Sequence, residues 1–259
     1  MTITTKIVGE EGAGSFRVYF MNGDHVVSPF HDVPLWVNQQ TAVANMLVEI
    51  PRGTNAKMEI STKELMNPIK QDVKDGKLRF VHDKYPFNYG ALPQTWENPN
   101  HVHPDTGAKG DNDPLDACEI GSALGTQGQF KQVKVLGVWA MLDAGETDWK
   151  ILCIDVTDPL AAQINTIEDV EKHMPGKIEE VFTFLRDYKI PDGKGPNKFA
   201  FDSKLLDKEF AVKITNETHE EWKALVTGAC ESPLAIESTL KEGVKKSVCG
   251  LATKTQLKL

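Results

Sequence analysis

The sequence predicts an α+β domain built on a β-barrel or a strongly curved sheet with flanking helices. Two observations favour this fold class: short apolar runs rich in β-branched residues fill the first 156 residues, and amphipathic helical patterns follow them. A third observation is the lack of any repeat period, which excludes solenoids and repeat arrays. The chain of 259 residues is long enough to bury a large core without a disulfide or a structural metal.

The predicted strands are short and are separated by turn-rich stretches, of which residues 86–90 and 97–114 are the clearest. Each run contains valine, isoleucine or an aromatic residue, which are typical of strands. The predicted strands occupy residues 16–20, 46–50, 56–60, 77–82, 115–121, 132–142, 149–156 and 209–214.

Two helices are predicted after the main run of strands. Asp158 supplies an N-cap and Pro159 a first helical position for a helix that runs through Met174. Residues 177–190 place their apolar side chains on one face, and Pro191 is expected to end that helix.

A third helix is predicted to begin at Thr218, because Glu221 three residues later completes a capping box. Residues 229–259 carry no strong pattern and are expected to form a peripheral C-terminal appendage.

The charge and hydropathy of the chain exclude several classes of protein. The 37 acidic and 29 basic side chains give a net charge of −8, which argues against nucleic-acid binding, since that affinity comes largely from Lys and Arg. No stretch of about 18 apolar residues predicts a transmembrane helix. The first 30 residues lack the apolar region of a secretory signal.

The four cysteines are widely spaced and form no C-x-x-C motif or zinc-ligand pattern. We interpret them as reduced thiols of a cytosolic protein. They are Cys118, Cys153, Cys230 and Cys249.

The strongest chemical signal is a cluster of four carboxylates within residues 111–119. Asp111 and Asp113 are two residues apart, so both point to one side if the chain is extended. Pro114 bends the path and lets Asp116 converge on the same space. Carboxylates that face one point repel each other unless a cation lies between them, and oxygen ligands without His or Cys suit Mg²⁺, Mn²⁺ or Ca²⁺.

Two plainer readings of this cluster can be weighed. A solvated acidic loop is the commoner meaning of an isolated D-x-D-x-x-D pattern. A calcium-binding EF-hand loop fails, because counting Asp111 as position one puts Leu115, Asp116 and Ser122 where the fifth ligand, the glycine and the bidentate glutamate should be.

A second acidic patch lies at residues 142–150, between two predicted strands. A hairpin there would hold Asp143, Glu146 and Asp148 at one end of the sheet, although an ordinary polar turn would look the same. Lys150 is unexpected in a plain calcium site, because its charge competes with the metal. It is understandable if the site also binds an anion.

Candidate anion ligands are scattered through the rest of the chain, and each could also be an ordinary surface or packing residue. Together with the acids they indicate a divalent-metal site for phosphate chemistry. These candidates are Lys57, Arg79, Tyr85, Tyr89, Tyr188 and Lys189, with Glu59 beside Lys57 on one strand face.

Residues 111–117 (DNDPLDA) closely resemble the signature of the family I soluble inorganic pyrophosphatases. The resemblance extends over residues 16–228, with the blocks in the family's order, and it is closest to the eukaryotic cytosolic branch. The other matching blocks are residues 29–36, 48–60, 67–80, 88–100, 142–150 and 187–195.

The resemblance implies a hydrolase that splits inorganic pyrophosphate into two orthophosphates. It implies a five-stranded OB-like β-barrel with flanking helices and peripheral strands, in one domain over residues 1–259 with its core at 16–228. By the same analogy the protein would be a cytoplasmic homodimer that uses Mg²⁺. Mn²⁺ or another divalent ion could substitute for Mg²⁺, and Ca²⁺ would inhibit.

The resemblance also assigns roles to the acids. Asp111, Asp116 and Asp148 match the ligands of the tightest metal site, and Asp116 would bridge to a second metal. Asp143 joins Asp148 around a metal that arrives with substrate, and Glu59 contacts another through water. Asp113 matches the carboxylate that takes the proton of the attacking water.

The remaining matches would hold the two phosphoryl groups or support the site. The phosphoryl ligands would be Lys57, Arg79, Tyr89, Lys150, Tyr188 and Lys189, of which Lys57, Arg79 and Tyr89 would act with Asp113 in catalysis. The accessory positions would be Glu49, Tyr85, Glu97, Glu146 and Lys194.

Two other classes of function stay open at this point. An inactive relative kept as a scaffold is disfavoured because every expected ligand is present, and an OB-like nucleic-acid binder is disfavoured by the negative charge. One departure concerns residues 85–90, which resemble the shorter bacterial arrangement and leave the position of Tyr85 less defined than that of Tyr89.

Overall fold

The computed structural model describes residues 2–236 and 238, and it has the mixed α+β fold that the sequence predicts. Within these residues, no helix combines the length and the apolar character needed to cross a bilayer. The strands are β1 (Ile3–Val8), β2 (Arg17–Asn22), β3 (His25–Val27), β4 (Trp36–Asn38), β5 (Val43–Ile50), β6 (Met58–Ile60), β7 (Ile69–Gln71), β8 (Val73–Lys74), β9 (Lys77–Leu78), β10 (Asn88–Ala91), β11 (Asp116–Glu119), β12 (Phe130–Asp143), β13 (Glu146–Asp155) and β14 (Lys198–Phe199). The α-helices are α1 (Ile167–His173), α2 (Lys177–Asp187) and α3 (Lys208–Thr227), with 3-10 turns at Ile190–Asp192 and Phe201–Ser203.

The main sheet has the strand order β14-β12-β13-β11-β10-β5-β4, and β12 also pairs with β5. The pairings among β5, β10, β11, β13 and β12 therefore return to the strand from which they start. All of these neighbours are antiparallel except β11 and β13, which run parallel.

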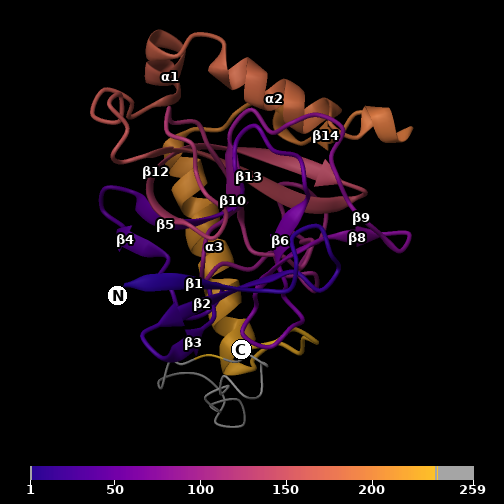
Figure 1. The fold of residues 1–259 in the computed structure, drawn as a ribbon. Helices are drawn as coiled ribbons and strands as arrows, with labels where there is room; N and C mark the ends of the chain where they lie inside the picture. Colours follow the sequence, from indigo (N-terminus) through magenta and orange to yellow (C-terminus); the bar gives the residue numbers. More distant parts are fainter. Residues whose placement is uncertain (1, 237, 239–259) are drawn as a thin grey trace.

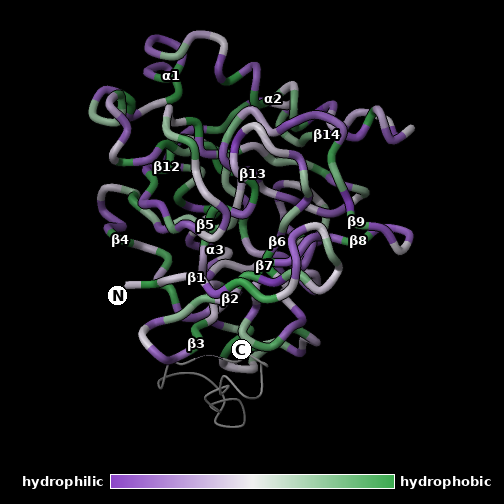
Figure 2. The backbone as a smooth tube through the Cα atoms, viewed as in Figure 1, coloured by the Kyte–Doolittle hydropathy of each residue, from purple (hydrophilic) through white to green (hydrophobic). Residues whose placement is uncertain are grey.

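A smaller sheet, in the order β1-β2-β7-β6 with β3 beside β2, lies at the end of the molecule opposite α1 and α2 (Figure 1). The hairpin β8–β9 projects from the body, and its residues are mostly hydrophilic, whereas hydrophobic residues concentrate in the strands at the centre (Figure 2). The polar hairpin and loops therefore lie at the surface of the strand-rich body, where a binding site can form.

The apolar core is divided by the sheet. One buried cluster includes Phe20, Phe87 and Trp139, and a second includes Met46, Val135 and Ile214 from α3. Helix α3 runs along β12 (Figure 1). The segment just before the helix approaches the strand most closely at Gly137, where a Cβ would lie 2.7 Å from the Leu206 carbonyl oxygen. Leu206 and Val138 also exchange two backbone hydrogen bonds, which hold the segment that leads into α3 against β12.

The predicted strand at residues 209–214 is wrong, because these residues lie in the first two turns of α3. Helix α3 begins at Lys208, where the Asp207 side chain accepts a hydrogen bond from the Phe210 amide, so Thr218 lies in mid-helix and is not its N-cap. The run Glu-Phe-Ala-Val-Lys-Ile alternates like a strand but also continues the three- and four-residue spacing of the buried face. No turn residue interrupts the run, so both structures are possible locally. The burial of Ala211 and Ile214 against the body of the protein selects the helix.

The other helix boundaries also differ from prediction. Helix α1 begins at Ile167, after a capping box formed by Thr166 and Asp169, and the Asp158 carboxylate instead caps a turn by accepting from the Leu160 amide. Helix α2 begins at Lys177 as predicted and ends at Asp187, before Pro191.

The predicted strand at residues 77–82 is shorter than expected, because β9 ends at Leu78. Beyond it Phe80 forms only an isolated bridge with Ala56, and the Phe80 side chain is exposed. The other predicted strands occur with boundaries shifted by a few residues.

Of the four cysteines, Cys118, Cys153 and Cys230 form no disulfide, and Cys249 lies outside the described residues. The appendage predicted at residues 229–259 is described up to 236 and at 238. Its first part packs back on the body: Leu234 is buried, and the Ala235 carbonyl oxygen accepts from Asn67.

His31 connects this C-terminal segment to α3. Its buried ring accepts a hydrogen bond at Nδ1 from the Trp222 indole, and its Nε2 lies 2.9 Å from the Ala235 carbonyl oxygen. The indole can only donate, so His31 must be neutral with its proton on Nε2. Burial lowers the pKa of His31 from 6.5 to about 4.

Between pH 6.5 and 4 the unfolded chain binds a proton at His31 that the folded protein excludes, so stability should fall as the pH falls. The loss approaches about 3 kcal/mol near pH 4. His31→Gln should remove this contribution, as measured by urea unfolding at pH 6.5 and 4.5. The exposed His25→Gln variant should keep the pH dependence of the parent protein; an unchanged dependence in His31→Gln would contradict the role of His31.

Candidate active site

A cavity of about 270 Å³ brings most of the predicted site residues together, although they come from widely separated parts of the chain. It lies over one end of β10, β11 and β13, beside β6 and the β8–β9 hairpin. Its walls are formed by Glu49, Lys57, Glu59, Ile60, Asp72, Arg79, Tyr89, Ala91, Asp111, Asp113, Pro114, Asp116, Asp143, Asp148, Lys150 and Tyr188.

Tyr89 is placed by β10, a strand whose four residues are all buried. A register shift between β10 and β5 follows it, where a Cβ on Gly90 would lie only 1.8 Å from the Leu47 carbonyl oxygen. Glycine is therefore required directly after Tyr89. The hydroxyl of Tyr89 donates to Asp116 over 2.5 Å, which fixes it at the floor of the cavity.

The β12–β13 hairpin places four of the predicted residues. Its turn residues Ala144 and Gly145 both have positive φ, as a two-residue hairpin requires, so Asp143 pairs with Glu146. Because side chains alternate along a strand, Asp148 and Lys150 then share one face of β13. The predicted hairpin is confirmed, with longer strands than expected.

Lys150 links the two acidic segments through strand register. The parallel pairing of β11 with β13 sets Asp116 opposite Lys150, whose ammonium group forms ion pairs with Asp116 and Asp148 and donates to the Tyr89 hydroxyl over 3.0 Å. Burial alone would lower the pKa of Lys150, but Asp116 and Asp148 raise it well above its usual value. The lysine thus stays charged inside the protein.

The segment from Asp111 to Asp113 is a turn and not the extended chain that was predicted. The Asp113 amide donates to the Asp111 carboxylate over 3.0 Å, and Asn112 between them has a φ of 76°. Both carboxylates still line the cavity, because Asn tolerates this left-handed conformation and the turn keeps them together.

The solvent-accessible Asp113 lies in an acidic surrounding. Partial desolvation in the cavity, followed by the charges of Glu59 and Asp116, raises the pKa of Asp113 to about 7. This carboxyl group is therefore easier to protonate than an ordinary aspartate.

Lys57 and Glu59 also line the cavity. The Lys57 ammonium group is 5.3 Å from the centre of the Tyr89 ring, within the range of a cation–π contact. Glu49 is buried beneath them and accepts a hydrogen bond from the Ile60 amide over 2.6 Å. Burial and the charge of Asp116 raise the pKa of Glu49 to about 8.

Arg79 is held by Asp72, a cavity residue that the sequence reasoning missed. The Arg79 guanidinium donates to the Asp72 carboxylate over 3.0 Å, and the Arg79 amide donates to the Asp72 carbonyl oxygen over 2.8 Å. The signal was present in the sequence: the Asp75-Gly76 turn predicts a tight hairpin that sets Asp72 opposite Arg79.

The remaining predicted residues are placed less uniformly. Tyr188 lines the cavity, and Lys189 does not, but its ammonium group pairs with the lining Asp143. Tyr85 is buried beneath Tyr89 with their ring centres 5.1 Å apart. Glu146 and Lys194 are exposed outside the cavity walls.

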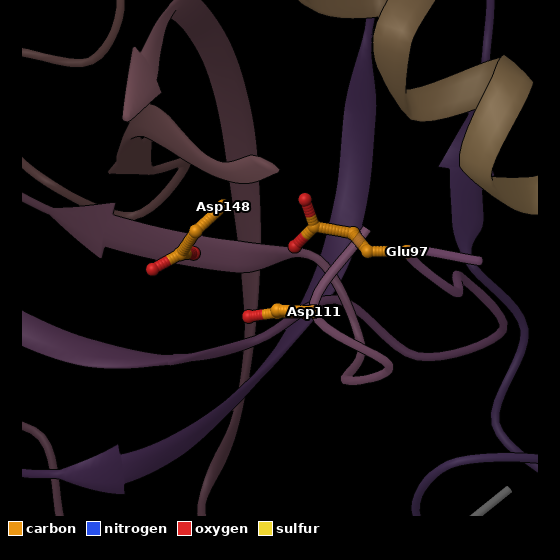
Figure 3. A group of neighbouring side chains, drawn as sticks. All are labelled: Glu97, Asp111 and Asp148. Carbon is orange, nitrogen blue, oxygen red and sulfur yellow. The ribbon is translucent and has the colours of Figure 1, made fainter. Parts of the chain in front are cut away.

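Glu97, expected only as an accessory residue, joins the acids from behind the cavity. Oxygen atoms of Glu97, Asp111 and Asp148 all lie within 4.8 Å of one another, and the three side chains point toward a common space (Figure 3). The Trp149 amide donates to Glu97 Oε1 over 2.9 Å, whereas buried Oε2 has no hydrogen-bond partner in the described part of the chain.

These three carboxylates fit a divalent cation. Burial, together with the charges of Asp111 and Asp148, raises the pKa of Glu97 well above its usual range, and the pKa of Asp111 is raised in the same way. Oxygen ligands without His or Cys match hard cations such as Mg²⁺, and a bound cation would satisfy the orphaned oxygen and relieve the repulsion.

Fold and cavity together define a class: an enzyme of phosphate chemistry, in which buried carboxylates suited to a metal face Lys, Arg and Tyr donors. The family model for inorganic pyrophosphatase matches residues 46–223. The chain belongs to the inorganic pyrophosphatase family, whose members are hydrolases of pyrophosphate.

Individual relatives agree with this assignment. The chain is 72% identical over 239 residues to the inorganic pyrophosphatase of Dictyostelium discoideum, covering 92% of this chain and 86% of the relative. The inorganic pyrophosphatase structure from Schistosoma japonicum matches with a TM-score of 0.89 at 47% identity, covering 92% and 87% of the two chains. A truncated Trypanosoma cruzi vacuolar soluble pyrophosphatase, solved in complex with PPi, matches with a TM-score of 0.83 at 42% identity, covering 86% and 91%.

Mg²⁺ should raise the thermal midpoint of unfolding, because a ligand that binds only the folded acids stabilises the fold. At a hundredfold excess over its dissociation constant the gain is about 2.7 kcal/mol, or roughly 5–10 °C for a chain of this size. Asp111→Asn should be more stable than the parent without metal and should gain less from Mg²⁺, as measured by differential scanning calorimetry.

The matched control is Asp75→Asn, on the exposed hairpin turn, which should show the full Mg²⁺ shift. An equal shift in Asp111→Asn and the parent protein would show that Asp111 does not bind the metal.

Proposed function

We propose that this protein hydrolyses inorganic pyrophosphate to two orthophosphates in a Mg²⁺-dependent reaction, with Asp113 as the base. The observation that carries the proposal is the convergence, on one cavity, of three cations with the six acids proposed to act on the metals or the attacking water. The acids are Glu59, Asp111, Asp113, Asp116, Asp143 and Asp148, and the cations are Lys57, Arg79 and Lys150. Membership of the inorganic pyrophosphatase family supports the same substrate.

The metal would be held by the carboxylates. Asp111, Asp116 and Asp148 are proposed to hold the tightest ion, with Asp116 shared by a second; Asp143 joins Asp148 around an ion that enters with substrate, and Glu59 acts through water. Bound divalent ions would lower the pKa of a coordinated water toward ~7 and offset the charge of the substrate. Mg²⁺ is the proposed ion, Mn²⁺ a substitute and Ca²⁺ an inhibitor.

Asp113 is proposed to orient the attacking water and to accept its proton. Its side chain is accessible to solvent in the cavity, and the turn that begins at Asp111 fixes its backbone. Its pKa of about 7 is near neutral pH, where a general base is most effective. No lysine or arginine among the described residues forms a salt bridge with Asp113, so its carboxylate can turn to a water.

The phosphoryl groups would be held by Lys57, Arg79, Tyr89, Lys150, Tyr188 and Lys189. Arg79 presents a planar fork that suits phosphate oxygens, whereas the lysines act as point charges and the tyrosines donate hydrogen bonds without adding charge. Donors fixed in place before the reaction stabilise charge as it develops on the leaving phosphate. Glu49, Tyr85, Glu97, Glu146 and Lys194 are proposed as accessory residues.

Several finer features belong to the proposal. We interpret the closed ring of β5, β10, β11, β13 and β12 as the OB-like five-stranded barrel, within a single domain over residues 1–259. The resemblance to the eukaryotic branch supports a cytoplasmic homodimer, and the free thiols are typical of a reducing compartment. Pyrophosphate and phosphate are the proposed partners; nucleic acids and membranes are not.

Asp113→Asn should lower pyrophosphate turnover by ~10²–10⁴-fold, because it removes the proton acceptor and leaves the shape of the site intact. Phosphate release under saturating Mg²⁺ measures turnover, and the Mg²⁺-induced thermal shift should be kept. The Asp75→Asn variant should turn over pyrophosphate at the parent rate. Parental activity in Asp113→Asn would eliminate Asp113 as the base.

Phosphate release from pyrophosphate should require Mg²⁺. The parent protein should be active with Mg²⁺ and inactive in EDTA, because the buried acids repel the polyanion without a cation between them. Addition of Ca²⁺ to the Mg²⁺ reaction should inhibit. Absence of phosphate release in every condition would refute the enzymatic function.

A further inference from the structure

The C-terminal end of α2 carries two of the proposed phosphate ligands, Tyr188 and Lys189. Tyr188 directly follows the helix, and its amide donates to the Phe184 carbonyl oxygen over 3.0 Å. The Tyr188 ring stacks on the Phe184 ring with 5.8 Å between the ring centres, and the Lys189 ammonium group lies 5.3 Å from the centre of the Tyr188 ring. The position of both ligands therefore depends on the position of this helix end.

A residue from outside the helix closes this end. An α-helix leaves its last carbonyl oxygens without partners inside the helix. The side-chain amide of Asn197 donates to the Leu185 carbonyl oxygen over 2.8 Å, and the Asn197 backbone amide donates to the Arg186 carbonyl oxygen over 2.8 Å. Asn197 thus satisfies two of the carbonyl oxygens at the end of α2.

Asn197 also connects the helix end to the main sheet. The next two residues form β14, in which Lys198 pairs with Leu142 of β12. Asp143 directly follows Leu142, lines the active-site cavity and forms an ion pair with Lys189. The contacts of Asn197 therefore join the strand end that carries a proposed metal ligand to the helix end that carries the phosphate ligands.

The loop between α2 and Asn197 contributes little to its own position. Residues 190–196 are all exposed, so the loop buries no side chain that could hold it against the body. The backbone amides of residues 192–194 donate to the carbonyl oxygens of Lys189 and Ile190, inside the same segment. Asn197 is therefore the anchor at the C-terminal end of this loop.

We propose that Asn197 is a positioning residue for pyrophosphate, which holds the end of α2 against β14 and so keeps Tyr188 and Lys189 in place around the substrate. This role rests on the proposed function, in which Tyr188 and Lys189 hold a phosphoryl group. Asn197 does not line the cavity, so it acts through these two residues. Its loss should weaken the binding of substrate without weakening the binding of the tightest metal ion.

Methylenediphosphonate separates binding from turnover, because a CH₂ group replaces the bridging oxygen of pyrophosphate and prevents hydrolysis. In saturating Mg²⁺, isothermal titration calorimetry should show about tenfold weaker binding of this analogue to Asn197→Ala than to the parent protein, since one modest interaction supplies about that factor. The KM for pyrophosphate should rise by a similar factor. Asn197→Asp should bind the analogue more weakly still, because its carboxylate faces the Leu185 carbonyl oxygen and the negative end of the helix.

Mg²⁺ should bind both substrate-free variants as tightly as it binds the parent protein, because the ligands proposed for the tightest ion, Asp111, Asp116 and Asp148, lie in other parts of the chain. A purely structural role of Asn197 would lower the thermal midpoint and leave the affinity of the folded protein for the analogue unchanged. Calorimetry with Mg²⁺ alone and with the analogue therefore distinguishes the two roles.

Asn45→Ala is the matched control, because Asn45 makes the same pair of contacts outside the cavity lining. Its side-chain amide donates to the Pro34 carbonyl oxygen and its backbone amide to the Leu35 carbonyl oxygen, each over 2.8 Å. This variant should bind the analogue like the parent protein.

The role of Asn197 is refuted if Asn197→Ala and Asn197→Asp bind the analogue as tightly as the parent protein, or if Mg²⁺ binding weakens as much as analogue binding. Phosphate release by the parent protein tests the proposed function separately. A parent protein that releases no phosphate refutes that function, whereas an active parent protein whose variants bind the analogue equally well refutes only the role of Asn197.

Discussion

The candidate active-site cavity depends on the ion pairs that the buried Lys150 ammonium group forms with Asp116 and Asp148. The ammonium group lies between Asp116 of β11 and Asp148 of β13, and the two strands are parallel neighbours with Asp116 and Lys150 in register. A carboxylate buried without a cation would be protonated or would destabilise the fold. The lysine therefore allows two strands to bring acids into the interior, and Tyr89 is oriented by its contact with the same pair.

The acidic residues matter through their positions in the cavity, and not through the net charge of the whole chain. Eight acids and three cations line one cavity, so the acids raise each other's pKa while each lysine or arginine compensates part of the charge. This leaves a site that gains from divalent cations and, once they bind, favours a polyanion. The overall charge of −8 describes none of this, because only the positions of the acids decide what the surface attracts.

Strand β13 and the segment before Asp111 form a wall between two cavities of different chemistry. The candidate active-site cavity combines carboxylates with Lys, Arg and Tyr, whereas a second cavity, of about 330 Å³ between α3 and the loop of residues 97–110, combines carboxylates with indole rings. Glu97 belongs to both environments: its oxygens lie near Asp111 and Asp148, and its side chain lines the second cavity.

The sequence by itself determined the mixed fold class, the β12–β13 hairpin and the acidic segment from Asp111 to Asp116, because strand periodicity and the D-x-D-P-x-D pattern are local properties. The more distant cavity residues, such as Lys57 and Arg79, were assigned to the site only through the resemblance to a family. Sequence reasoning misassigned residues 209–214, whose apolar spacing suits a strand and a helix alike, and only packing against β12 selected the helix. Glu97 was predicted only as an accessory residue, and Asp72 was not predicted at all. Proximity to Asp111, Asp148 and Arg79 comes from the pairing of distant strands and loops, and no local pattern encodes that pairing.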